Sequence, residues 1–250
     1  MLTAEQTTHF RTQGYVVVPA MTHAAYCRTV IAFAQHALRE HAEPIEYESD
    51  TQYQGAPVSR EAEGGQTARR ILHVAARSPL IINWAKGWRL RQCLVQLLGE
   101  GVHLSQAHHN CIMTKQPRFS SVTGWHRDSR YWNFERPGLV SVWLALGRET
   151  PENGGLKVLP GSHQWVVSSN QIDADQFFRT DVQENQNLLK RAVNIQLRTG
   201  DVLFFHSNLF HSAGCNQTTQ TKFSMVFTYR GADNPPLPGS RSGSVEEVAI

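Results

Sequence analysis

The sequence predicts a mainly β fold with helices packed against it, of the sandwich or jelly-roll type. Short apolar runs separated by turn residues follow one another after Gly101, as in domains built from many strands. Stretches with helical spacing precede them, within about the first 100 residues. The length of 250 residues and the apolar content of 40% suit one large domain with a sizeable core.

Composition narrows the class of protein. The net charge is +3, but no run of Lys and Arg is dense enough for a nucleic-acid track, so we expect no nucleic-acid partner. The cysteines lie far apart without a CxxC pair, which favours a reduced, cytoplasmic setting and no thiolate metal site. No apolar run reaches the roughly 20 residues that span a bilayer, and no signal-peptide pattern opens the chain, so we expect no membrane part.

The first elements are predicted by caps and apolar spacing. Residues 3–6 fit a capping box, which begins a short helix that ends at Gly14. A buried strand follows at residues 15–19. Thr22 can cap a second helix, whose apolar face fades near Glu40.

The next region combines an irregular segment with a long helix. Residues 41–68 are polar and show no sustained period, so we interpret them as a lid over the site or as a plain loop. Residues 79–98 carry an apolar side at helical spacing and are followed by Gly99, which predicts one long helix.

The remaining chain is predicted to form the β core, about residues 101–231. Residues 164–191 form an excursion with some helical content, and the Pro-, Gly- and Ser-rich tail, 232–250, is predicted to be extended. With the helical part, about 1–100, these regions form one predicted domain, 1–250. The predicted core strands are 102–115, 140–146, 156–159, 192–197, 202–205, 210–213 and 223–229.

A candidate metal site centres on His126 and Asp128. In an extended segment, residues two apart point to the same side, so the pair forms half of a ligand set. His211 lies on a separate predicted strand, 211 − 126 = 85 residues later. Two imidazoles and one carboxylate suit non-haem Fe(II) with open positions, but zinc also uses such ligands. Spacing alone leaves the metal open, and His206 could be confused with His211.

Several segments resemble the phytanoyl-CoA dioxygenase family of Fe(II)/2-oxoglutarate oxygenases. The most specific runs from Glu152-Asn153-Gly154-Gly155 to Gly161-Ser162-His163, and Trp125-His126-Arg127-Asp128 matches the His-x-Asp of the family. The segments that carry the resemblance are 3–19, 110–115, 125–128, 142–146, 152–163, 200–206 and 211–216.

The resemblance implies a double-stranded β-helix (a cupin-like jelly roll) with flanking helices. It implies that His126, Asp128 and His211 ligate Fe(II), with 2-oxoglutarate as co-substrate and dioxygen as oxidant. Cys111 and Trp143 would line the 2-oxoglutarate pocket. The implied activity is hydroxylation of a small organic molecule, with succinate and carbon dioxide as co-products.

One departure from the family concerns the cation for the far carboxylate of 2-oxoglutarate. The family usually places an Arg eleven residues after the distal His, and here 211 + 11 gives Lys222. Lysine supplies the charge without the planar fork of arginine. Arg230, eight positions further along the same predicted strand, and Lys115 are the other candidates.

Candidate substrate contacts follow the His-x-Asp motif and precede the long helix. Arg130, Tyr131 and Trp132 could face the opening of the site, and Arg70 could meet an anionic group. Asp128 completes the ligand set, which favours hydroxylation over the halogenation seen where related enzymes lack this carboxylate. The alternatives are a divalent-metal hydrolase or isomerase on a jelly roll, and a non-catalytic ligand-binding member of the family.

Overall fold

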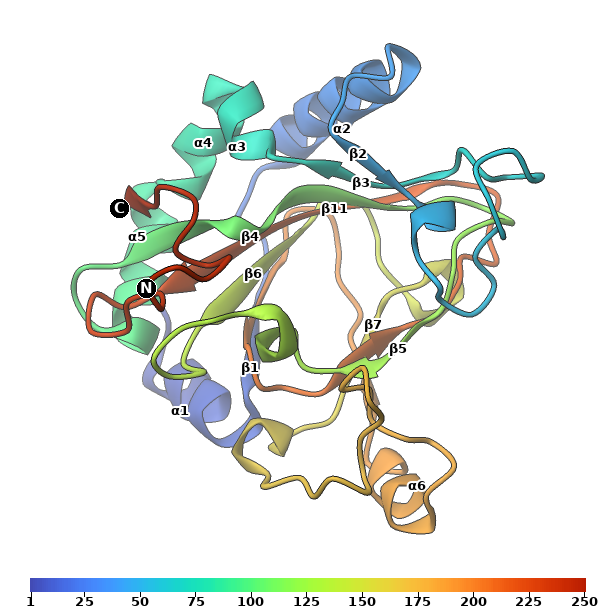
Figure 1. The fold of residues 1–250 in the computed structure, drawn as a ribbon. Helices are drawn as coiled ribbons and strands as arrows, with labels where there is room; N and C mark the ends of the chain where they lie inside the picture. The colour runs from blue at the N-terminus through green and yellow to red at the C-terminus, as the bar shows by residue number, and fades with distance from the viewer.

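Two antiparallel β-sheets face each other in the computed structural model, which describes residues 1–250 (Figure 1). The strands are β1 (Tyr15–Val18), β2 (Ile45–Tyr47), β3 (Ala68–Leu72), β4 (His103–Lys115), β5 (Thr123–His126), β6 (Val140–Ala145), β7 (Leu156–Val158), β8 (Val193–Asn194), β9 (Val202–His206), β10 (His211–Ala213), β11 (Lys222–Arg230) and β12 (Val248–Ala249). The larger sheet has the order β1-β9-β6-β11-β4-β3-β2, with β12 beside β4, and the smaller has the order β5-β10-β7-β8. The predicted jelly-roll class is thereby confirmed.

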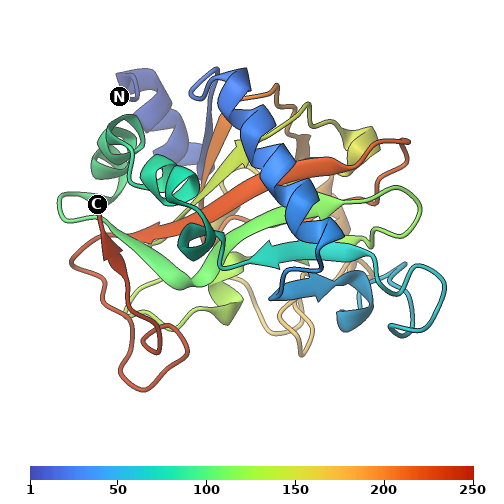
Figure 2. The same ribbon diagram turned by 90° about the horizontal axis from the view of Figure 1, so that it is seen from above.

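Helices cover the outer face of the larger sheet, and α2 lies across it (Figure 2). The α-helices are α1 (Ala4–Gln13), α2 (Ala24–Arg39), α3 (Val74–Arg77), α4 (Pro79–Ala85), α5 (Trp88–Leu98) and α6 (Gln183–Leu189). The 3-10 helices are η1 (Glu48–Asp50), η2 (Asp128–Tyr131), η3 (Pro151–Asn153) and η4 (Ser162–Gln164). None of them combines the length and the apolar content needed to cross a bilayer.

Side chains of the central strands alternate between two cores. On β11, Met225 and Phe227 pack in the outer core with residues of α2 and α5, whereas Val226 packs in the inner core between the sheets. On β6, Val142 packs in the outer core and Trp143 packs in the inner core. Because both faces of these strands are covered, they read as continuous apolar runs in the sequence.

The first cap is as predicted, and the second lies one residue away. The Thr3 hydroxyl accepts a hydrogen bond from the Gln6 amide at 3.1 Å, which completes the capping box of α1. At α2 the N-cap is His23, without a side-chain cap, so the prediction for Thr22 is wrong. The Thr22 hydroxyl instead accepts from the Trp84 indole at 2.9 Å and ties this turn to α4.

The prediction of one helix over residues 79–98 is also wrong. The helix breaks between α4 and α5, where Gly87 is extended with ψ of 138°. A Cβ at Gly87 would lie 2.9 Å from the carbonyl oxygen of Trp84, so the break uses the missing side chain. Apolar spacing continues through the break because both helices pack on the same sheet.

The segment 41–68 is more regular than its composition predicts. It contains β2 and η1, and β2 pairs with β3, which in turn pairs with β4. These strands extend the larger sheet beyond the site. They escaped detection because β2 has only 3 residues, too few for its alternation to be recognised in the sequence.

The later chain differs from prediction mainly in strand length. Only Val193 and Asn194 of the predicted strand 192–197 form β8. The excursion 164–191 contains α6, as its apolar residues suggested. The tail returns to the larger sheet, where Val248 pairs with Leu104.

The turn before β9 provides a test of the fold. Gly200 has φ of +88°, and a Cβ there would lie 2.0 Å from the carbonyl oxygen of Thr22. Gly55 has φ of +84° with nothing within 4 Å, so it reports the backbone strain alone. We expect Gly55→Ala to lower the free energy of unfolding by about 1 kcal/mol and Gly200→Ala by about 3 kcal/mol or more in urea titrations. Equal losses would contradict this packing.

Candidate active site

The predicted metal ligands converge on one point between the sheets. His126 ends β5 and His211 begins β10, and these two residues are direct partners in the antiparallel ladder. Their ring centroids are 4.3 Å apart. Asp128 begins η2 just after β5, and one ligand atom from each of the three residues lies within 4.8 Å of the others.

Both imidazoles present a free nitrogen to this point. Nδ1 of His126 lies 2.8 Å from the Gly124 carbonyl oxygen, and Nδ1 of His211 lies 3.0 Å from that of Leu209. Nδ1–H therefore donates to a carbonyl, which assigns the lone pair to Nε2. The two Nε2 atoms lie 3.9 and 3.6 Å from Oδ1 of Asp128. Burial and the neighbouring His211 lower the pKa of His126 to about 3, so it is a neutral ligand at physiological pH.

The Asp128 carboxylate is held from both sides. Oδ2 accepts a hydrogen bond from the Ser141 hydroxyl at 2.9 Å, and Oδ1 lies 3.1 Å from Nε2 of His109. Burial alone would raise the pKa of Asp128, but His109 and His211 hold it well below its usual range. Burial likewise opposes a charge on His109, and the carboxylate outweighs it, raising the pKa of that imidazole to about 9. The carboxylate is therefore anionic and oriented before any metal binds.

A bulge in β4 brings His109 to the carboxylate. Along the β11 ladder, Phe227 pairs with Asn110 and Thr228 with Ser105, so residues 106–109 have no partner there. This 106–109 bulge places His108 and His109 in the lining of the cavity beside the metal ligands. Bulges commonly redirect side chains next to functional sites.

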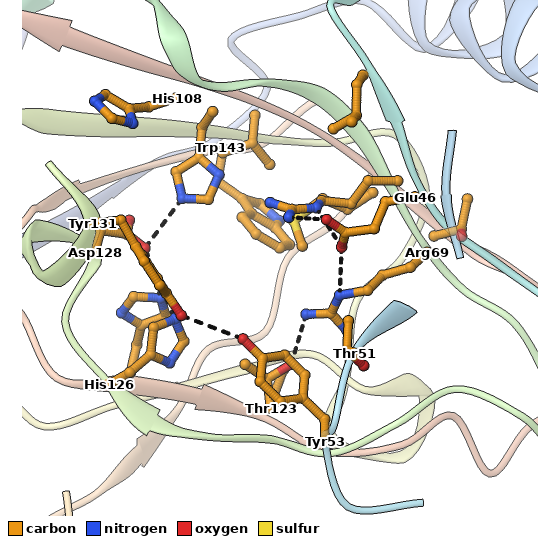
Figure 3. Close-up of a pocket in the computed structure, with 18 of the residues that line it drawn as sticks. Glu46, Thr51, Tyr53, Arg69, His108, Thr123, His126, Asp128, Tyr131 and Trp143 are labelled. Atoms are coloured by element: carbon orange, nitrogen blue, oxygen red, sulfur yellow. Dashed lines mark hydrogen bonds and ion pairs between the residues drawn. The ribbon is translucent and has the colours of Figure 1, made fainter. Parts of the chain in front are cut away.

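The metal ligands line a cavity of about 430 Å³ (Figure 3). In the close-up, His126, Asp128 and Tyr131 lie on one side and Glu46, Arg69 and Tyr53 on the other. The predicted site residues that line the cavity are His126, Asp128, His211, Trp143, Lys115, Lys222, Arg70, Tyr131 and Trp132.

Three predicted residues do not line this cavity. Cys111 is buried in the inner core and does not line the cavity. Arg130 stacks on Phe177, with 3.9 Å between its guanidinium carbon and the ring centroid. Arg230 forms an ion pair with Glu247 at the far end of β11, about 26 Å from Lys222 for eight steps along a strand.

Lys222 lines the cavity within a buried polar network. Its ammonium lies 3.3 Å from Oε2 of Glu149 and donates to the Ser224 hydroxyl at 2.9 Å. Glu149 also accepts from the Trp143 indole at 3.0 Å and from Ser224 at 2.7 Å. A buried carboxylate thus already neutralises the cation that stands at the position of the family's arginine.

Segment 41–68 contributes to the wall and to the mouth of the cavity. The hydroxyl groups of Tyr53 and Tyr131 lie 3.4 Å apart across it, a contact drawn in Figure 3. The Arg69 guanidinium lies over the Tyr53 ring, 4.8 Å from the centroid, and forms an ion pair with Glu46 at 3.2 Å. Residues of this segment therefore form part of the cavity lining.

Sequence reasoning missed the residues that orient the ligands. Ser141 lies two positions before Trp143 on β6, and this spacing was the available signal that both face inward. His109 carried no such signal, because its orientation depends on the 106–109 bulge. Glu149 lies outside the strands, and its role depends on the fold of the loop after β6.

The donor set fits a divalent metal. Two imidazoles and an anionic carboxylate, all buried, leave one face for further ligands, which is the arrangement of non-haem Fe(II) oxygenases. The double-stranded β-helix and this triad together define a 2-oxoglutarate-dependent non-haem iron oxygenase.

Comparison with known proteins agrees with this class. Residues 10–224 match the family model of phytanoyl-CoA dioxygenase (PhyH), and the chain belongs to that family. The ectoine dioxygenase of Sphingopyxis alaskensis is 26% identical over 251 residues, which cover 93% of this chain and 77% of that protein. The predicted resemblance is thus confirmed.

Solved structures share the fold. EctD from S. alaskensis with 2-oxoglutarate and 5-hydroxyectoine has a TM-score of 0.79 and 23% identity, over 94% of this chain and 78% of that one. The epimerase SnoN in complex with Fe3+, alpha ketoglutarate and nogalamycin RO has a TM-score of 0.75 and 21% identity, over 96% and 86% of the two chains.

The contact between His109 and Asp128 predicts a contribution to metal affinity. We expect His109→Ala to weaken Fe(II) or Mn(II) binding by about 10- to 100-fold, because the carboxylate loses one of its two orienting partners. Anaerobic calorimetric titration of the metal measures this. His108→Ala is the matched control, because the neighbouring imidazole bonds to Ser242 at 2.7 Å and makes no hydrogen bond to Asp128. Equal affinities in the two variants would contradict the assigned role.

Proposed function

We propose that the protein hydroxylates an unactivated C–H bond of a small organic molecule. One oxygen atom of dioxygen enters the product, and the other enters succinate as 2-oxoglutarate loses carbon dioxide. The complete triad of His126, Asp128 and His211 carries this proposal, because all three ligands point to one place in the cavity.

The protein's own residues supply position and shielding. His126 and His211 would hold the metal through Nε2, and Ser141 and His109 fix the orientation of the Asp128 carboxylate. Bound Fe(II) supplies the oxygen chemistry, which side chains do not provide. This reaction requires no side-chain general base and no side-chain nucleophile.

The cavity supports a small substrate. About 430 Å³ lies in the range of sites for small molecules, about 300–1,000 Å³. Tyr131 and Trp132 offer apolar surface beside the triad, and Arg70 is already paired with Glu46. The Tyr53–Tyr131 contact would exclude water once the substrate is bound. We therefore propose that segment 41–68 acts as a lid.

Anaerobic addition of Fe(II) and then 2-oxoglutarate tests the reaction class. We expect a visible charge-transfer band that is lost in His126→Ala, because that variant lacks one of the two imidazole ligands. Admission of dioxygen should then release succinate, even slowly, without added substrate. The control is Arg130→Ala, which changes a neighbour of Asp128 that does not line the cavity and should keep the band.

The same experiment separates the alternatives. A hydrolase or isomerase would turn over its substrate without dioxygen and 2-oxoglutarate. A non-catalytic binding protein could show the band but would release no succinate. Intact metal binding without any band would contradict the proposal.

A further inference from the structure

We propose that Lys115, rather than Lys222, is the counter-ion for the far carboxylate of 2-oxoglutarate in this protein. The inference rests on the proposed function and assigns a cation that lies outside the family's usual arginine position. Lys115 ends β4 and is the direct cross-strand partner of Lys222 at the start of β11. Both side chains are buried and line the cavity.

The ion pairs around the two lysines favour Lys115. Three of the four cations in this part of the cavity already have carboxylate partners. Arg69 lies 3.2 Å from Glu46 and 3.5 Å from Glu48, and Arg70 makes a two-pronged pair with Glu46. Lys222 is paired with Glu149. Lys115 donates to the Ser121 carbonyl and forms no ion pair.

A charge count leads to the same residue. The ion pairs of Arg69, Arg70 and Lys222 use the carboxylates of Glu46, Glu48 and Glu149. Among these three carboxylates and the four cations, one positive charge is in excess when Lys115 is protonated. The far carboxylate of 2-oxoglutarate carries one negative charge. A buried anion needs such a free partner, because an uncompensated charge is costly in a low-dielectric site.

The position of the Lys115 side chain is constrained. A Cβ at Gly154 would lie 3.3 Å from Cγ of Lys115, so the stem packs against that glycine and keeps the ammonium at the cavity. The surrounding groups are Arg69 from β3, Glu48 from η1, Lys222 from β11 and Cys215 after β10. Burial, then Arg69 and Lys222, lower the pKa of Lys115 to about 7, against the opposing effect of Glu48.

A pH dependence follows from this environment. Below pH 7 the free ammonium is charged and meets the carboxylate, whereas above pH 7 it must gain a proton when 2-oxoglutarate binds. The dissociation constant should therefore rise about 25-fold from pH 6.5 to 8.5. At pH 8, binding should take up roughly 0.9 proton for a free pKa near 7.

Calorimetry of the Fe(II)-loaded protein without dioxygen tests this, with 2-oxoglutarate as the probe, in two buffers of different ionisation enthalpy. Lys115→Arg keeps a permanent charge, so we expect affinity that no longer changes with pH and the loss of that proton uptake. Lys115→Met should weaken binding about tenfold or more at pH 6.5. Thermal melting shows that each variant is folded before it is used.

The outcomes are distinct. The assignment of Lys115 would be overturned if the affinity of Lys115→Arg for 2-oxoglutarate fell with pH as in the wild type. It would also be overturned if Lys115→Met bound 2-oxoglutarate as tightly as the wild type. A wild-type protein that binds metal but no 2-oxoglutarate at pH 6.5 would overturn the proposed function as well.

Discussion

The buried carboxylate of Asp128 is the charge on which the site depends. A carboxylate that is 1% exposed must be compensated, and in this fold three imidazoles and one hydroxyl surround it. Each comes from a different place: His126 from β5, His211 from β10, His109 from the 106–109 bulge and Ser141 from β6. The smaller sheet thus carries the two histidine ligands, and the larger sheet carries the residues that orient Asp128.

Most of the cationic side chains at the cavity are also compensated by opposite charges. They are committed to carboxylates of the protein, so charge alone does not identify a ligand contact. Lys222 and Lys115 illustrate this, because they are cross-strand neighbours, yet Lys222 forms an ion pair with Glu149 and Lys115 bonds only to a backbone carbonyl. The arginine position of the family is here part of a structural network with Glu149, and the free charge has moved one strand away. The substitution to lysine thus agrees with a rearranged site that keeps its capacity for a dicarboxylate.

Local patterns predicted the jelly roll and the candidate triad, because short apolar runs between turns and the His-x-Asp spacing are properties of short segments. They did not predict His109, whose direction depends on a bulge defined by a neighbouring strand. They also placed Arg230 on the same face as Lys222, which is true of a strand but ignores the distance along it. The helix break at Gly87 was hidden, since apolar spacing continues across it. The predictions that failed were those that depend on how distant segments pair and pack, which residue types along the chain do not reveal.

The most direct test of this account is a crystal structure of the anaerobic complex with Fe(II) and 2-oxoglutarate. We expect a metal bound by Nε2 of His126, a carboxylate oxygen of Asp128 and Nε2 of His211, with the far carboxylate of 2-oxoglutarate within hydrogen-bond distance of the Lys115 ammonium. A metal bound elsewhere, or a far carboxylate that contacts Lys222 while Lys115 remains on the Ser121 carbonyl, would contradict it.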